Sequence, residues 1–169
     1  MDKQPRMSGD SGARDAILSA FRDILLEGGY EKCRVLDVVE RSGAARSTFY
    51  EYFQSKNDLL KESLRVPFEV FGELVAPACD TGRVALTLDH IRQHRALMAS
   101  LIANPGLDTL IGVLADSLEE RAALVPHIAR AIAAAQLALL SHWLDGKDSR
   151  SAADLARIML NVSVALRGL

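Results

Sequence analysis

Apolar residues recur every three or four positions along most of this chain, and no stretch alternates between apolar and polar residues as a half-buried strand would. The pattern therefore predicts an all-α fold. A first helix is expected over residues 13–27, because Gly28 and Gly29 supply a strong stop signal. Residues 1–12 are polar and lack periodicity, which predicts a mobile tail. The apolar stripe of the first helix consists of Ile17, Leu18, Phe21, Ile24 and Leu25.

Two short helices are predicted within residues 35–53, joined by a tight turn at Gly43. Glycine marks the turn because it can leave a helix at positive φ without strain. Phe49 and Phe53 lie four residues apart, on the side expected to be buried against the first helix. Residues 13–56 are thus expected to form a three-helix domain. The outward side chains of its third helix are Arg46, Ser47, Thr48, Tyr50 and Tyr52.

A short helix that presents Arg, Ser, Thr and Tyr side chains has the proportions of an element that enters the major groove of DNA. The same pattern also fits a helical hairpin with a polar face. Periodicity alone favours neither interpretation, since helix-turn-helix patterns produce many false positives.

A longer helix is predicted to start at Lys56, with Ser55 as its N-cap, and to run to Val75. Pro67 lies in its interior, where a kink or break is expected. Residues 57–169 would form a second helical domain. Its further helices are expected over residues 83–103, 107–121, 126–144 and 151–166, with a turn at 145–148.

The helix over residues 126–144 is apolar nearly all round and rich in alanine between positions 128 and 138. Small side chains let another helix approach closely, and a helix of this kind is covered on more than one side. The turn that follows makes the last two helices antiparallel neighbours. We therefore expect a homodimer formed through the last two helices, although burial wholly inside one chain would produce the same pattern.

Composition and charge exclude several classes of protein. No apolar run approaches the roughly 20 residues of a membrane span, and the first residues lack the apolar core of a signal peptide, so a cytoplasmic protein without membrane contact is expected. Residues 1–65 carry equal numbers of basic and acidic side chains. Any attraction to phosphate must therefore come from the placement of single residues such as Arg34, Arg46 and Lys56, each at the start of a predicted helix.

Motifs for catalysis or for cofactor binding are not found. The two cysteines lack CxxC spacing. His90 and His94 are spaced to share a metal ion, but the segment lacks the glutamate of an HExxH motif and a third ligand. We therefore predict no enzyme, no cofactor and no metal site.

A series of short segments resembles the DNA-binding domain of the TetR family of transcriptional regulators in order and spacing. These segments are Gly29-Tyr30, Asp37-Val38-Val39, Ser42-Gly43-Ala44, Ser47-Thr48-Phe49-Tyr50, Tyr52-Phe53 and residues 55–60. The resemblance implies a repressor that binds a palindromic double-stranded operator as a dimer and is released by a small-molecule effector. It implies DNA contacts from Arg34, Arg46, Ser47, Thr48, Tyr50, Tyr52 and Lys56.

The same resemblance implies an effector pocket in the second domain, between the long linking helix and the three helices that follow. The residues expected to line it are Phe68, Phe71, Ile91, His94, Met98, Leu118, His127 and Trp143, with Leu88, Leu114 and Gln136 as further candidates. Each of these residues also fits a plain helical core.

An alternative function is an all-α dimeric interaction protein that keeps the helix-turn-helix shape without affinity for DNA. The absence of net charge on residues 1–65 favours this alternative. So do departures from the family pattern at Cys33-Arg34, Ala45 and Glu51. A duplex-binding assay would distinguish the two functions.

Overall fold

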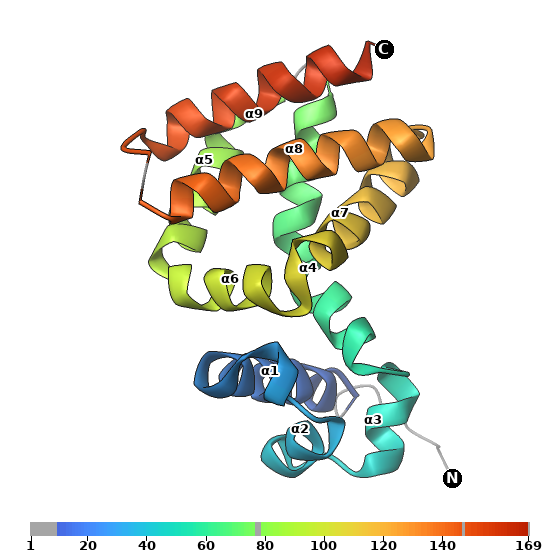
Figure 1. Ribbon diagram of the computed structural model, residues 1–169. Helices are drawn as coiled ribbons and strands as arrows, with labels where there is room; N and C mark the ends of the chain where they lie inside the picture. The colour runs from blue at the N-terminus through green and yellow to red at the C-terminus, as the bar shows by residue number, and fades with distance from the viewer. Residues whose placement is uncertain (1–9, 77–78, 147, 169) are drawn as a thin grey trace, which may run out of the picture. The chain divides into compact units, whose positions relative to one another are not determined.

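The computed structural model describes residues 10–76, 79–146 and 148–168, and within these residues the chain is helical and contains no strand. The predicted all-α fold is therefore confirmed. The chain divides into two compact units, Met1–Ser63 and Leu64–Leu169. The division falls inside helix α4, seven residues beyond the predicted boundary at residue 56. Figure 1 labels the helices and colours them from blue at the amino terminus to red at the carboxy terminus.

The amino-terminal unit contains α1 (Asp10–Lys32), α2 (Val35–Ser42), α3 (Arg46–Tyr52) and the start of α4. The predicted stop at the glycine pair corresponds to Gly29, whose φ of 76° and ψ of 172° interrupt the helical backbone of α1. The helix begins at Asp10 rather than at the predicted residue 13, so residues 10–12 of the predicted tail are helical. Residues 1–9 lie outside the described part of the chain.

Packing of the three helices and α4 around one apolar core explains why such short elements are stable. Phe49, Phe53 and the predicted first-helix stripe point inward, apart from Leu18, which is only partly covered. Burial of this face, rather than intrinsic helix propensity, supplies most of the stability of short helices. The most completely buried side chains are Ile17, Phe21, Val38, Phe49, Leu59 and Leu60.

Helix α4 (Lys56–Gly72) continues through Pro67 without a break, and a 3-10 turn follows at Glu73–Val75. Ser55 caps its start, as predicted, because its Oγ accepts a hydrogen bond of 3.2 Å from the Asp58 N–H. A proline removes one helical hydrogen bond. Phe68 and Phe71 in the following turn are both buried, so packing stabilises the helix beyond the proline.

The carboxy-terminal unit continues with α5 (Thr81–Gln93) and α6 (Arg95–Leu101), where a single helix over residues 83–103 was predicted. That prediction was wrong because the backbone leaves the helical region at His94, with φ −104° and ψ 30°. The His94 N–H is shared between the carbonyls of His90 and Ile91, at 3.2 and 3.1 Å, so the helix closes there. A π-helical turn at Ile102–Gly106 then leads into α7 (Leu107–Ala122).

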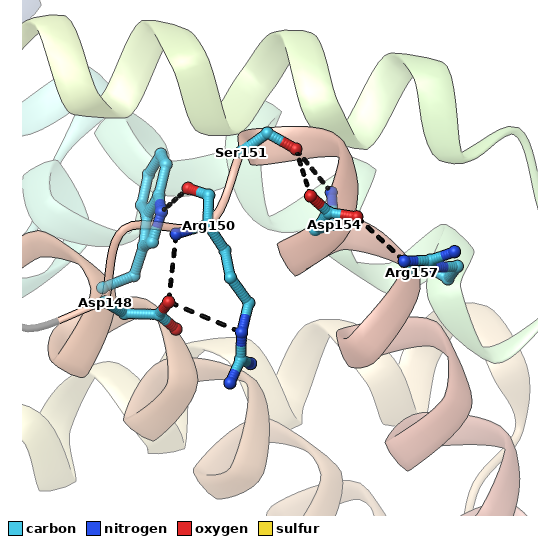
Figure 2. Close-up of polar contacts among 6 residues, drawn as sticks. Asp148, Arg150, Ser151, Asp154 and Arg157 are labelled. Atoms are coloured by element: carbon cyan, nitrogen blue, oxygen red, sulfur yellow. Dashed lines mark hydrogen bonds and ion pairs between the residues drawn. The ribbon is translucent and has the colours of Figure 1, made fainter.

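The last two helices, α8 (Pro126–Leu144) and α9 (Ala152–Arg167), lie side by side (Figure 1). Their predicted bounds are confirmed, without change for α8 and within one residue for α9. Ser151 caps α9, because its Oγ accepts from the Asp154 N–H at 3.1 Å and donates to the Asp154 carboxylate at 2.7 Å (Figure 2). This bond and the neighbouring Arg157 lower the pKa of Asp154. Of the predicted turn at 145–148, Lys147 lies outside the described residues.

One polar side chain crosses the core of the carboxy-terminal unit. Gln136 of α8 is fully buried, and its Nε2 donates to the Phe71 carbonyl at 3.3 Å and to Ser163 Oγ at 2.9 Å. The Ser163 hydroxyl in turn donates to the Met159 carbonyl at 2.7 Å. The amide therefore links the end of α4 to α8 and α9, and fixes their register more specifically than apolar packing would.

Among the described residues, no helix combines the length and the apolar character needed to cross a bilayer.

Candidate nucleic-acid interface

The start of α2 is held by a reciprocal contact between Arg34 and Asp37. The Arg34 backbone N–H and Nε both donate to Asp37 Oδ2, at 3.3 and 3.0 Å, and Arg34 Nη2 donates to Oδ1 at 2.8 Å. This ion pair lowers the pKa of Asp37 and raises that of Arg34. Arg34 remains exposed, but its guanidinium is largely occupied in capping the helix rather than free to meet a phosphate.

The turn between α2 and α3 depends on Gly43, which adopts the left-handed conformation with φ 68° and ψ 7°. Its N–H contacts the Glu40 carbonyl at 3.4 Å. The Ser42 hydroxyl donates to the Val39 carbonyl at 3.0 Å and accepts from the Ala44 N–H at 3.3 Å. These local bonds satisfy the end of α2 and redirect the chain into α3 within three residues.

Replacing Gly43 with alanine is expected to destabilise the amino-terminal unit by about 1 kcal/mol, because a Cβ is strained at positive φ. No atom lies within 4 Å of the position that this Cβ would take, so the cost is conformational and not steric. Gly43→Asn is the matched control, since asparagine tolerates this conformation better. Urea denaturation of the parent chain and both variants measures whether Gly43→Ala is the least stable of the three. Equal stability of Gly43→Ala and the parent chain would contradict the prediction.

Helix α3 buries one side and exposes the other. Phe49 and Phe53 are buried, whereas Arg46 and Tyr50 are exposed. The Tyr50 ring packs edge-on against Phe49 at 5.2 Å, and the Arg46 guanidinium lies 5.7 Å from the Tyr50 ring centroid. Ala45 occupies the N-cap without a side-chain bond, so the backbone N–H groups of the first turn are not capped from the protein side.

Of the residues predicted to contact DNA, all lie on α3 or at the starts of α2 and α4. On α3, Ser47 is exposed, while Thr48 and Tyr52 are half-buried. The predicted outward face is therefore centred on three exposed residues, Arg46, Ser47 and Tyr50. These residues form what we call the α3 face.

Lys56 differs from the prediction in its surroundings, because it is half-buried and bonded within the unit. Its Nζ donates to the Tyr30 carbonyl at 3.0 Å and lies 4.0 Å from the centroid of the Tyr30 ring. The Tyr30 hydroxyl donates to Asn57 Oδ1 at 3.2 Å. Sequence reasoning missed this role of Tyr30, for which the only signal was its position in the Gly29-Tyr30 segment. Burial raises the pKa of the Tyr30 hydroxyl.

Two further arginines of the amino-terminal unit are paired with carboxylates. Arg41 Nη1 lies 2.7 Å from Glu27 Oε1, and Arg14 forms an ion pair with Glu62. Arg46 makes no ion pair with any residue in the part of the chain that the structure describes. It is thus a positive charge on the α3 face that no described carboxylate of the unit neutralises.

The predicted effector-pocket residues separate into two groups. Phe68, Phe71, Ile91, Met98, Leu118 and Trp143 are buried in the carboxy-terminal unit, as are Leu88, Leu114 and Gln136. The second group consists of His94 and His127, whose side chains are exposed. A recess of about 160 Å³ lies elsewhere in this unit, where Arg92, Arg95 and Arg150 surround Trp143 and Leu144. We call it the arginine recess. Trp143 is the one predicted pocket residue among those that line it.

The histidine pair of the carboxy-terminal unit has no third candidate metal ligand beside it among the described residues. His90 and His94 lie with their ring centroids 4.6 Å apart, but among the described residues no third histidine, cysteine or carboxylate completes a group that could hold a metal ion.

Comparison with known proteins gives a family match in the amino-terminal unit. The family model described as bacterial regulatory proteins, tetR family, matches residues 17–63. An uncharacterized HTH-type transcriptional regulator of Bacillus subtilis, YvdT, is 42% identical over 50 residues. That alignment spans 30% of this chain and 26% of the relative, so the chain matches only about a quarter of the length of this curated protein.

Solved structures resemble the chain over nearly its whole length. A TetR-family regulator from Streptomyces coelicolor covers 98% of this chain and 100% of its own, with a TM-score of 0.68 at 20% identity. A TetR transcriptional regulator from Streptococcus agalactiae covers 91% of this chain and 94% of its own, with a TM-score of 0.56 at 24% identity. At such identities the likeness supports the fold of both units.

The sequence match, the helix-turn-helix geometry and the fold agree with one another. The family matched by residues 17–63 is one of regulatory proteins, which agrees with the expectation of a regulatory protein rather than an enzyme. Residues 17–63 therefore match the amino-terminal domain of the TetR family of bacterial regulatory proteins, and the chain shares the fold of solved TetR-family structures.

Proposed function

We propose that this chain is a transcriptional repressor that binds a palindromic operator as a homodimer through its α3 face and is released by a small-molecule effector. The observation that carries the DNA-binding part is the exposure of Arg46, Ser47 and Tyr50 on a helix whose opposite side is fixed by buried Phe49. A helix held rigidly from behind can enter the major groove without losing much conformational freedom.

The roles of the contact residues follow from their surroundings. Arg46 has no ion-pair partner among the described residues and is long enough to reach a base edge, where a guanidinium pairs best with guanine. Ser47 and Tyr50 carry hydroxyls that suit phosphate oxygens, and Thr48 and Tyr52 flank them with less exposed hydroxyls. Lys56 keeps donor hydrogens beyond the one given to Tyr30, and Arg34 is a weaker candidate because Asp37 occupies its guanidinium.

Replacing Arg46 with alanine is expected to weaken operator binding by about 1–3 kcal/mol and to relax the preference at one base pair of each half-site. The removed side chain makes no ion pair with the described residues, so the fold should be unaffected. Arg22→Ala is a matched control, because Arg22 is also exposed but lies on α1. Fluorescence anisotropy with duplexes from the region upstream of the gene, and with single-base variants of them, measures both effects.

An unchanged sequence profile for Arg46→Ala would remove this residue from base readout. A similar loss for Arg22→Ala would mean that general charge, and not the α3 face, holds the duplex. Lys56→Ala is a less direct test, because it also removes the bond to the Tyr30 carbonyl and so affects stability as well as phosphate contact.

Release by an effector would act through α4, which contributes Lys56 to the first unit and Phe68 and Phe71 to the second. A ligand that binds one position of this helix better than another would change DNA affinity by the same factor by which DNA changes ligand affinity. Titration of an identified effector with and without operator tests this coupling. Equal effector affinity in the two titrations would exclude that compound as the inducer.

A second candidate function, a dimeric interaction protein without DNA affinity, is favoured by one specific observation. Arg14, Arg34, Arg41 and Lys56 are all engaged by groups of their own unit, so few cations remain for phosphate. The salt dependence of duplex binding distinguishes the two functions. A repressor loses affinity steeply as salt rises, whereas the interaction protein shows no binding even at low salt.

A further inference from the structure

The arginine recess combines residues from three places along the chain. Arg92 comes from the end of α5, Arg95 from the start of α6, and Arg150 from the loop between α8 and α9. Its apolar part is formed by Trp143 and Leu144 at the end of α8, both buried. Gly146, Asp148 and Ser149 complete the lining. The recess therefore pairs an apolar floor with a rim of three arginines and one carboxylate.

The rim carries more positive than negative charge. Arg92 Nη2 lies 2.7 Å from Asp89 Oδ1. Arg150 Nε lies 3.5 Å from Asp148 Oδ1 (Figure 2). Arg95 forms no hydrogen bond or ion pair through its side chain with the residues that the structure describes. Its guanidinium is thus left with all its donors for an incoming group, and a carboxylate matches that planar fork.

The loop side of the recess is fixed by hydrogen bonds before any ligand arrives. The Trp143 indole N–H donates to the Arg150 carbonyl at 2.8 Å, and the Arg150 N–H donates to Asp148 Oδ1 at 3.1 Å (Figure 2). On the other side of the recess, the Arg92 guanidinium lies 5.2 Å from the centroid of the indole. A site whose groups are already held in place loses less entropy when it binds.

We propose that the arginine recess binds a small organic acid with a short apolar body. Arg95 receives the carboxylate, and the body lies on Leu144 and the edge of Trp143. The volume of about 160 Å³ is that of a cavity that accommodates a molecule of roughly benzene size, so a small acid such as butyrate fits. This site is independent of the α3 face and does not rest on the proposed DNA binding.

The sequence supplies its own reporter, because Trp143 is the only tryptophan of the chain. Tryptophan fluorescence is measured while the full chain is titrated with butyrate, with its neutral isostere butyramide, and with inorganic phosphate, all at constant ionic strength. A saturable change with butyrate at a Kd in roughly the millimolar range is expected, as suits a ligand of so few atoms. Butyramide and phosphate should bind at least about tenfold more weakly, since each lacks one of the two features.

Two variants locate the site. Arg95→Gln should weaken butyrate binding about tenfold, because it removes the charge-assisted bonds to the carboxylate. Arg157→Gln, the matched control, removes an exposed arginine of α9 that pairs with Asp154 outside the recess, and should leave the Kd unchanged. Equal binding of butyrate and butyramide, equal binding of phosphate, or an equal loss in the two variants would each overturn the proposal, as would the lack of any saturable response.

Discussion

Replacing Phe49 with alanine is expected to unfold the amino-terminal unit and abolish DNA binding. Phe49 is fully buried and packs against Phe53, with ring centroids 5.9 Å apart. Truncating a buried phenylalanine typically costs about 3–5 kcal/mol, through lost burial and the cavity that remains. A unit of this size has few kcal/mol to lose, because small domains bury a modest fraction of their surface.

Tyr50→Ala is the matched control for this prediction. Tyr50 is the neighbouring residue and is 40% exposed, so its truncation should reduce DNA affinity while leaving the fold intact. Urea denaturation followed by circular dichroism separates the two variants from each other. A Phe49→Ala protein with the denaturation midpoint of the parent chain would show that α3 is not held by the core described above.

Replacing Ala138 with glutamate is expected to convert a homodimer into monomers. Ala129 and Ala133 are buried inside the unit, whereas Ala138 is exposed and Ala134 only partly covered. An alanine-rich outer face on α8, together with the exposed Val164 on the neighbouring helix α9, is suited to close packing with a second copy of the two helices. A carboxylate placed in such a seam without a partner costs several kcal/mol, which corresponds to more than about a hundredfold in the dimer Kd.

Sedimentation velocity at micromolar concentration measures this change, and Ala134→Glu should act in the same direction. Ala99→Glu is the control, because Ala99 is exposed on α6, outside the last two helices. If the parent chain already sediments as a monomer at this concentration, the dimer and its proposed seam are both excluded. Dissociation of the Ala99→Glu chain would place the interface on a different face.

The sequence predicted local features of the fold well, since these depend on neighbouring residues. Pro126 marked the start of α8, Ser55 capped α4, and Gly43 formed the turn between α2 and α3, all from rules that act within a few positions. The break at His94 was not predictable in this way. The helical apolar period continues across it from Ile91 to Met98, so the pattern contains no stop signal there.

Contacts between distant segments account for the remaining differences. The bond from Lys56 to the Tyr30 carbonyl joins residues 26 apart, and it gives a predicted DNA contact a structural role as well. The arginine recess likewise unites Arg92 and Arg95 with Arg150, which no spacing rule connects. Conversely, His94 and His127 are exposed, unlike the other predicted pocket residues, because periodicity places a residue on a helix face but does not say what covers that face.

In the proposed function, the α3 face of a dimer reads an inverted-repeat operator. Selection of bound duplexes from a random pool by the parent chain tests this most directly, whatever DNA surrounds the gene. We predict enrichment of a palindrome whose half-sites are centred about 10 base pairs, or a multiple of one helical turn, apart. A pool that stays unenriched after repeated rounds at low salt, where binding to phosphate is strongest, would contradict DNA reading by the α3 face.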